Sequence, residues 1–238
     1  MDADRLDAEV TGCAAAHQRL LADLDLLTDD QVCSASLLPK WTVGHVLNHI
    51  VRNAESMIRV FAAAGDGLVV ERYAGGVAGR NAGIEDGADR SAAELVAEVR
   101  ATIWRLEQSW ATASTEAWQG RSVETSGREI PVSDLPFLRW REVEVHHADL
   151  GLGFTFDDWS DAYVTAELAK QLPRVPERLG PDDADDADHA DHADDADDAD
   201  DADDVIAPLR ADLGDRRLLA WLIGRWSRPD LPDLAAWH

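Results

Sequence analysis

Apolar residues recur at helical spacing in four long stretches of the chain. Their pattern predicts amphipathic helices over residues 3–27, 43–64, 92–112 and 135–150. Thr42 and Ser91 are the expected N-caps of the second and third of these helices, and Ser133 or Asp134 is the expected N-cap of the fourth. Two short strands around Ser126-Gly127 are expected to form a hairpin just before the fourth helix. Four long amphipathic helices favour an antiparallel four-helix bundle, so the fold is predicted to be mainly α.

Two parts of the chain lack this clear periodicity. Residues 65–90 are rich in glycine, aspartate and arginine, and are predicted to form a long irregular connection of the kind that is often functional or mobile. After Gly151 the pattern weakens. One helix is expected over residues 161–172 and at least one more over residues 205–226.

An acidic low-complexity tract, residues 182–204, interrupts the second half of the chain. It holds fourteen aspartates and no lysine or arginine, and so supplies more than half of the net charge of −25. Because like charges repel and the tract offers no large apolar side chain, it is predicted to be a disordered, solvated linker. Its His189 and His192 are expected to bind cations only weakly. The rest of the chain is also acidic, which argues against nucleic acid or an anionic membrane as a partner.

The cysteines and the apolar runs bear on the location of the protein. Cys13 and Cys33 are the only cysteines, and they form neither a CxxC site nor a disulfide framework. The first residues are acidic and polar, unlike a signal peptide, and no apolar run approaches the roughly eighteen residues of a membrane span. A cytoplasmic protein in a reducing compartment is therefore expected.

The fourth predicted helix carries an unusual pair of polar residues. Glu142 and His146 lie four residues apart on its apolar stripe, whereas Glu144 lies on the opposite side and is expected to face solvent. A carboxylate and an imidazole that face a core need strong partners, and no buried arginine or lysine is expected there. His49, at the border of the apolar stripe of the second helix, is a candidate third ligand. Two histidines and one carboxylate are typical of catalytic zinc with an open fourth position.

Other interpretations of these residues remain open. A buried, hydrogen-bonded Glu142–His146 pair without a metal is the alternative to a zinc site, because Glu-x-x-x-His spacing is common in helices. His45 is expected to lie outside the ligand set or to be exposed. His17 is expected to lie at the edge of the core with a backbone partner, and Cys13 to be a small buried hydrophobic residue.

Four motifs follow one another in a consistent order within residues 5–155. They are Trp41-Thr42-x-x-His45-x-x-x-His49, Arg80-Asn81, Ser126-Gly127-Arg128-Glu129-Ile130-Pro131, and Arg141-Glu142-x-x-x-His146-x-x-Asp149-Leu150-Gly151. Together they resemble the mycothiol-dependent maleylpyruvate isomerase family, which belongs to the broader group of DinB-like metalloproteins. The resemblance implies a DinB-like four-helix bundle over residues 1–155 that holds zinc on His49, Glu142 and His146.

The same resemblance implies a reaction. The open zinc position would take the thiol of mycothiol and favour its thiolate. In an isomerase of this kind the thiolate adds to the cis double bond of an unsaturated dicarboxylate, the new single bond rotates, and elimination gives the trans product. Arg80 and Arg225 match family arginines that would hold the carboxylates of the substrate.

The C-terminal region departs from the family pattern. Residues 156–238 are predicted to be a degenerate second domain, because the acidic tract lies near the place of its strand-rich middle. We expect an enzyme, monomeric or weakly oligomeric, that acts on a small molecule such as an unsaturated dicarboxylate or another electrophile. Transfer of the thiol to an electrophile is a second possible reaction. A non-catalytic metal-binding or interaction module with an acidic tether is the alternative function.

Overall fold

The computed structural model describes residues 2–179 and 198–235. The chain divides into two compact units, an N-terminal unit that ends at Thr155 and a C-terminal unit that begins at Phe156. Each unit is described by itself below.

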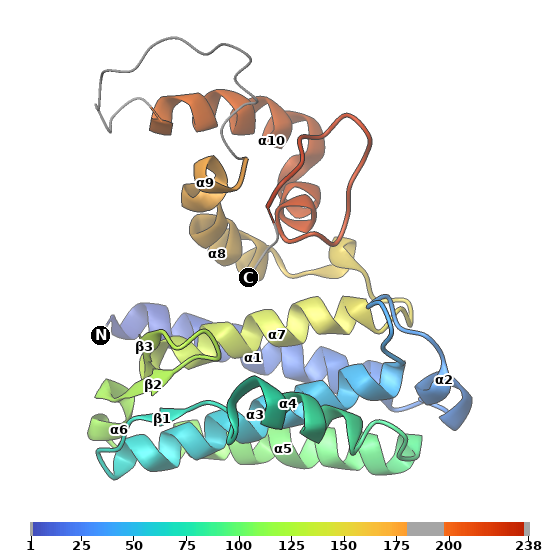
Figure 1. Ribbon diagram of the computed structural model, residues 1–238, viewed down its shortest axis with the longest axis vertical. Helices are drawn as coiled ribbons and strands as arrows, with labels where there is room; N and C mark the ends of the chain where they lie inside the picture. Colours follow the sequence, from blue (N-terminus) through green and yellow to red (C-terminus); the bar gives the residue numbers. More distant parts are fainter. Residues whose placement is uncertain (1, 180–197, 236–238) are drawn as a thin grey trace. The chain divides into compact units, whose positions relative to one another are not determined.

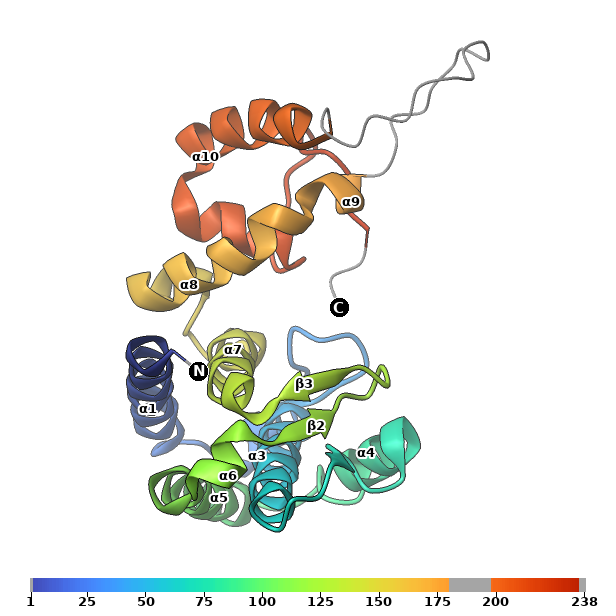
Figure 2. The same cartoon turned by 90° about the vertical axis from the view of Figure 1, so that its left-hand side faces the viewer.

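Four long helices make up most of the N-terminal unit (Figures 1 and 2). They are α1 (Ala3–Leu24), α3 (Val43–Gly65), α5 (Ala92–Thr112) and α7 (Leu135–Asp149). Helix α3 packs against α5 and α7, and α1 packs against the same two helices. Many of the side chains between them are aliphatic and fully buried, and include Leu20, Leu47, Ile50, Leu95, Leu106 and Val143. The predicted positions of these helices are confirmed, and the prediction for α5 is correct at both ends.

Side-chain caps fix the starts of three of these helices. Asp2 caps α1 by accepting from the backbone N–H of Arg5 at 3.2 Å. Thr42 caps α3 in a capping box in which His45 reaches back to the backbone N–H of Thr42, and Ser91 caps α5 in the same way with Glu94. Helix α7 begins differently. Asp134 precedes it, but its side chain makes no capping hydrogen bond, because a short 3-10 turn, Val132–Asp134, leads directly into the helix. The predicted cap at Ser133 or Asp134 is therefore wrong as a side-chain cap.

The connection over residues 65–90 is more regular than the sequence indicates. It contains strand β1 (Val70–Glu71) and helix α4 (Gly76–Glu85). Strand β1 pairs in parallel with β2 (Arg121–Val123), which pairs antiparallel with β3 (Glu129–Pro131) in the predicted hairpin. The prediction of an irregular connection is wrong because the partner of β1 lies about fifty residues away in sequence, and because α4 buries only Ile84 and so has almost no apolar periodicity. Two short helices, α2 (Asp29–Cys33) and α6 (Thr115–Gln119), complete the unit.

The C-terminal unit is also helical. It contains α8 (Asp161–Gln171), α9 (Val175–Leu179) and α10 (Asp198–Leu222), and α10 packs against the other two. Gly214, with a φ of 71°, breaks α10 into two helical segments. Trp159, Tyr163 and Leu218 are fully buried in the core of this unit.

The acidic tract is only partly described. Residues 182–197, with His189 and His192, lie outside the described residues. Residues 198–204, however, form the first turns of α10, so the prediction of disorder is wrong for them. Alanine, which recurs in this stretch, has a high intrinsic helix propensity. The packed part of α10 supplies the nucleus from which such a helix extends.

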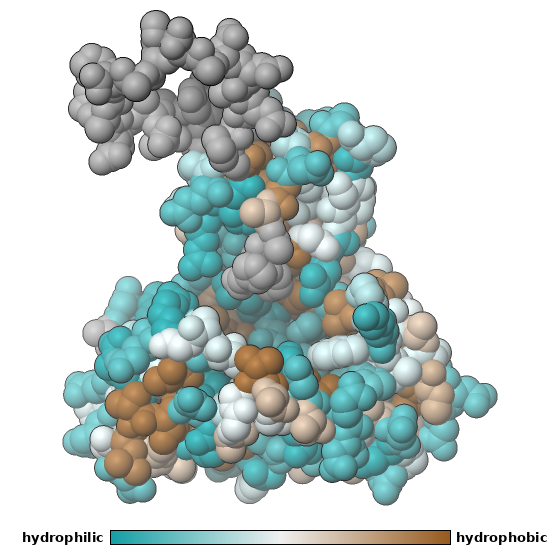
Figure 3. Space-filling model, in the orientation of Figure 1, coloured by the Kyte–Doolittle hydropathy of each residue, from teal (hydrophilic) through white to brown (hydrophobic). Residues whose placement is uncertain are grey.

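On the face shown in Figure 3, apolar side chains are scattered among hydrophilic ones, and the largest group lies at one end of the N-terminal unit. Leu68 and Val69, just before β1, are both more than half exposed. Figure 3 shows hydrophobic side chains gathered at the same end of the unit, where β1 and α6 lie. Among the described residues, no helix combines the length and the apolar character that a membrane crossing requires.

A charged network lies inside the helical core of the N-terminal unit. The guanidinium group of Arg139, on α7, is fully buried and donates to Nε2 of His17 at 3.1 Å, to the carbonyl of Ile50 at 2.8 Å and to Oδ1 of Asn53 at 3.0 Å. Nδ1 of His17 contacts a carboxylate oxygen of Glu107 at 2.9 Å. Two predictions are therefore wrong: a buried arginine does lie near Glu142, and His17 has side-chain partners. Four helices must meet before this network exists, so it leaves no pattern in any one helix.

We expect His17 to make the stability of the protein depend on pH. Burial, assisted by the charge of Arg139 and opposed by Glu107, lowers the pKa of His17 from 6.5 to about 4. The folded state then keeps His17 neutral, while the unfolded state takes up a proton below about pH 6.5. The contribution of His17 is complete above pH 6.5 and is lost as the pH falls towards 4, by up to ~3 kcal/mol.

Chemical unfolding of wild type and His17→Gln at several pH values between 4 and 7 tests this prediction. A glutamine cannot titrate, so its free energy of unfolding should fall less over this range than that of the wild type. A metal chelator in all samples prevents metal binding by the other histidines. Their contribution to the pH dependence is then the same in both proteins. Parallel curves for the two proteins would contradict the prediction.

Candidate metal centre

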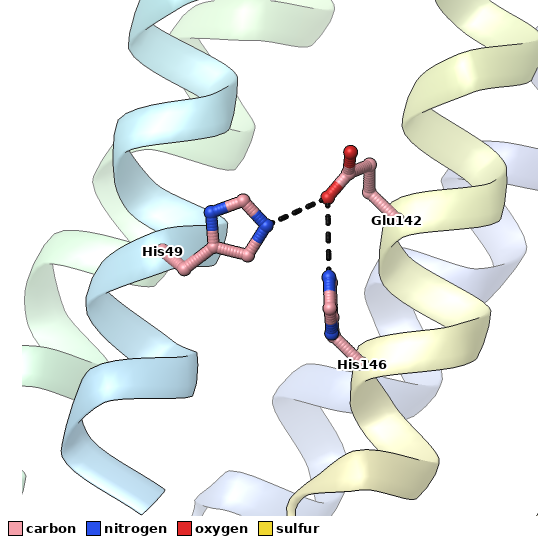
Figure 4. A group of neighbouring side chains, drawn as sticks. All are labelled: His49, Glu142 and His146. Atoms are coloured by element: carbon pink, nitrogen blue, oxygen red, sulfur yellow. Dashed lines mark hydrogen bonds and ion pairs between the residues drawn. The ribbon is translucent and has the colours of Figure 1, made fainter. Parts of the chain in front are cut away.

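Helices α3 and α7 bring together the three predicted ligands (Figure 4). Nε2 of His49 lies 2.8 Å from Oε2 of Glu142, and Nε2 of His146 lies 3.3 Å from the same oxygen. One ligand atom from each of the three residues lies within 4.8 Å of the other two. Within the described ranges, no other three histidine, cysteine, aspartate or glutamate side chains converge in this way.

The surroundings of α7 differ from those expected. Its most exposed row is Leu138, Glu142 and His146, which was predicted to be its core-facing stripe, because α1 and α3 cover most of the rest of the helix. His49 is only 2% exposed, whereas Glu142 is 24% and His146 15% exposed. The three donor atoms therefore meet at the edge of the core of the N-terminal unit.

Glu144 lies on the covered side of α7, although it was expected on the exposed side. It was predicted to face solvent, but it is buried and accepts from Arg19 of α1 at 2.5 Å and from the indole N–H of Trp140 at 3.1 Å. Helix α1 covers this side of α7 because Gly12 has no side chain: a Cβ there would lie 2.4 Å from the ring of Trp140. The prediction of a solvated Glu144 is therefore wrong.

Asp149 orients one of the three ligands. Its Oδ2 lies 2.8 Å from Nδ1 of His146, and the carboxylate is almost completely buried. A carboxylate in this position fixes the proton on Nδ1 and leaves Nε2 free for a metal, as in many zinc sites. No role was predicted for Asp149 from the sequence. Its position three residues after His146 on the same helix is the signal that was available.

Arg80 contacts the other histidine. Its NH2 lies 3.3 Å from Nδ1 of His49, and NH1 lies 3.1 Å from the side chain of Asn81. Arginine can only donate, so Nδ1 of His49 accepts in this arrangement and Nε2 carries the proton that points to Glu142. Helix α4, which carries Arg80, is anchored to α3 by the amide of the fully buried Asn48. This amide donates to the carbonyls of Gly83 and Ile84 at 2.9 Å and 2.6 Å.

His45 and Trp41 lie close to the ligands. Nδ1 of His45 lies 2.7 Å from Oγ1 of Thr42, and its Nε2 lies 3.4 Å from Glu85. His45 thus belongs to the cap of α3 and is not one of the converging ligands, as expected. The ring of Trp41 lies 5.6 Å from the ring of His49 and forms an apolar wall beside it.

The three candidate ligands influence one another's pKa. Burial lowers the pKa of His49 to about 4, although Glu142 opposes the shift. Burial alone would raise the pKa of Glu142, but the two histidines outweigh it and bring the pKa well below its ordinary value. Burial would lower the pKa of His146, but its hydrogen bonds to Asp149 and Glu142 raise it overall. A divalent cation requires an ionised carboxylate and neutral imidazoles with a free Nε2. Binding at His49 therefore requires its proton to lie on Nδ1, and Arg80, which can only donate, then has to move away from that nitrogen.

Arg225, the other predicted substrate-binding residue, belongs to the C-terminal unit. It is half-buried, and its NH1 donates to the carbonyl of Ile223 at 3.3 Å. It lines a pocket of that unit together with Arg178, Trp221 and Trp226. Its pairing with Arg80 stays a prediction.

The fold and the site together define a class of protein. A mainly helical unit with a small sheet presents two histidines and a glutamate from neighbouring helices, which is the donor set of a divalent-metal site. The family model for the mycothiol maleylpyruvate isomerase N-terminal domain matches residues 13–151. The chain therefore belongs to the mycothiol-dependent maleylpyruvate isomerase family.

Two solved structures are similar to this chain. One is the crystal structure of a mycothiol-dependent maleylpyruvate isomerase, with 25% sequence identity and a TM-score of 0.67, and the similarity covers 72% of this chain and 71% of that one. The other is a histidine-to-alanine mutant of such an isomerase, with 24% identity, the same coverage and the same TM-score. None of the curated proteins matches the chain.

Proposed function

We propose that this protein is a zinc-dependent, mycothiol-using enzyme that isomerises an unsaturated dicarboxylate of the maleylpyruvate type. The observation that carries the proposal is the convergence of His49, Glu142 and His146 at the edge of the helical core. Membership of the isomerase family supports the use of mycothiol and the class of reaction.

The donor set fits zinc. Two imidazole nitrogens and one carboxylate oxygen are the protein ligands of many catalytic zinc sites, which leave the fourth position open. When bound, zinc would supply a positive charge that lowers the pKa of a thiol and orients it. The partial exposure of Glu142 and His146 leaves room for such a thiol beside the metal.

The chain's own residues have distinct roles in this proposal. Asp149 holds His146 with its Nε2 directed to the centre. Glu142 supplies the negative charge. Arg80, on α4, lies beside His49 and would bind a carboxylate of the substrate.

The proposal extends to the frame and the setting of the site. We propose that α1, α3, α5 and α7 form an antiparallel four-helix bundle that keeps the ligands in place, and that residues 156–238 are a reduced second domain. A reducing cytoplasm would suit an enzyme that uses a thiol, and free Cys13 and Cys33 are compatible with it.

Metal analysis followed by an activity assay tests this function. We expect about one zinc per purified chain, and trans product from maleylpyruvate at a rate that depends on mycothiol but does not consume it. Consumption of one mycothiol per product would instead identify a thiol transferase. Zinc-loaded protein without turnover would support a metal-binding module, and protein that takes up no zinc would refute the metal centre.

A further inference from the structure

A pocket rich in arginine lies beside the candidate metal centre, within the N-terminal unit. It has a volume of about 250 Å³, and its lining includes Arg52, Arg59, Arg72, Arg80, Tyr73 and Glu55. Arg80 links the pocket to the metal centre, because its NH2 lies 3.3 Å from Nδ1 of His49. Arg52 and Ser56 follow His49 at successive turns of α3, so one face of the helix continues from the metal centre into the pocket.

The charge of this pocket contrasts with that of the whole protein. The chain carries a net charge of −25, yet four arginines and a single carboxylate line the pocket. Glu55 is already paired, with Arg52 at 2.7 Å and with Arg105 at 4.0 Å. The pocket is therefore a local positive site that attracts anions.

Three of the four arginines have partners. Arg52 binds the carboxylates of Glu55 and Glu98, each at 2.7 Å, and Arg59 donates to the backbone carbonyl of Glu71. Arg80 contacts Asn81 and His49. These three guanidinium groups already have partners within the protein, so they form the wall of the pocket.

Arg72 is different. Its Nε and NH2 are shielded from solvent and have no hydrogen-bond partner among the described residues. Burying donors of a charged group without a partner costs free energy. Because Arg72 lines the pocket, rotation of its side chain would present these donors to a bound anion and recover that free energy. The backbone of Arg72 is fixed next to β1, because its N–H donates to the carbonyl of Val123 at 3.0 Å.

Arg72 and Arg80 share one neighbour. Their guanidinium carbons lie 5.7 Å and 5.9 Å from the centre of the same Tyr73 ring. Tyr73 is almost completely buried and so provides a firm support for both. Both arginines also line the same pocket, so a small molecule bound in it can contact both. Guanidinium groups bind carboxylates in a planar, two-point manner.

We propose that this pocket binds a carboxylate of the substrate and that Arg72 is the residue that recognises it, next to Arg80. The inference rests on the proposed function for the identity of the substrate. It places both carboxylate-binding arginines in the N-terminal unit.

Binding of maleate, a small cis dicarboxylate, to the zinc-loaded full-length chain tests the proposal by titration calorimetry. The wild type should bind maleate saturably. Arg72→Gln should weaken binding by about ten- to a hundredfold. Arg72→Lys keeps the charge but loses the planar, two-point hydrogen bonding of a guanidinium group, so it should weaken binding less. Arg105→Gln removes a nearby half-exposed charge that does not line the pocket, so it should change the affinity by no more than about twofold.

Kinetics with maleylpyruvate give a second measurement. Loss of Arg72 should raise KM more than it lowers kcat, because the contact is made in the ground state as well as in the transition state. Thermal unfolding of each variant shows whether it is folded. Unchanged maleate affinity in folded Arg72→Gln, or loss of binding in Arg225→Gln instead, would overturn the inference.

The experiment separates this inference from the proposed function. If the protein turns over maleylpyruvate but Arg72→Gln binds maleate like the wild type, the inference fails and the function stands. If the protein takes up no zinc but Arg72 is still required for maleate binding, the function fails and the anion pocket stands.

Discussion

Replacing Glu142 by alanine is expected to remove zinc from the protein and, with it, the isomerase activity. Glu142 Oε2 is the atom on which Nε2 of both His49 and His146 converge, and no other carboxylate joins this group among the described residues. Removing a residue that only hydrogen-bonds to a metal ligand lowers metal affinity by about ten- to a hundredfold. Removing a ligand itself should therefore lower it by more than ~100-fold. His49→Ala and His146→Ala should have the same effect.

The measurement is zinc per chain by elemental analysis, beside the rate of mycothiol-dependent isomerisation. His45→Gln is the matched control: it removes a histidine one turn from His49 on the same helix, and glutamine can keep the capping box with Thr42. Asp149→Asn should give an intermediate loss of zinc affinity. If Glu142→Ala keeps its zinc, the three residues are a hydrogen-bonded structural cluster and the proposed function is wrong.

Replacing Arg139 by alanine is expected to be the most destabilising change in the core. Arg139 is fully buried and donates to His17, Ile50 and Asn53, so its loss leaves three buried acceptors with one partner fewer and a cavity between α1, α3 and α7. Each buried acceptor that loses its partner costs about 1–3 kcal/mol, and the cavity adds to this cost. Arg139→Met fills much of the same volume without a charge, so it should cost less than Arg139→Ala.

Urea unfolding at pH 7 measures these differences. Arg100→Met provides a comparison at the surface: Arg100 is more than half exposed and pairs with Asp25 at 2.9 Å, so its loss should cost at most about 1 kcal/mol. A cost for Arg139→Ala as small as that for Arg100→Met would show that the network contributes little to stability. A larger cost for methionine than for alanine would show that overpacking matters more than the lost contacts.

Features with a local signal in the sequence were predicted, and features that depend on packing were missed. The helix over residues 92–112 was predicted correctly because its cap, its apolar period and its end are all local signals. The three candidate ligands were found because a glutamate and a histidine four residues apart must lie on one face of a helix. Which face of α7 is covered could not be predicted in this way, and Glu142 and Glu144 were therefore assigned to the wrong surroundings.

The arginines show the same limit. Arg139 and Arg72 carry no local signal, since an isolated arginine in a sequence is most often a surface residue. One is buried because four helices meet around it, and the other borders a pocket because β1 pairs with a strand fifty residues away.

The sequence by itself determined the long helices, the caps of α3 and α5, the hairpin and the three candidate metal ligands. Each of these depends on spacing within about one or two turns or on a short motif, and such spacing is fixed by backbone geometry. Only the tertiary structure decided that α4 carries Arg80 to His49 and that Arg72 and Arg80 share Tyr73. Burial and partnership of charged groups depend on which helices and strands meet, and this is settled by packing across the whole unit.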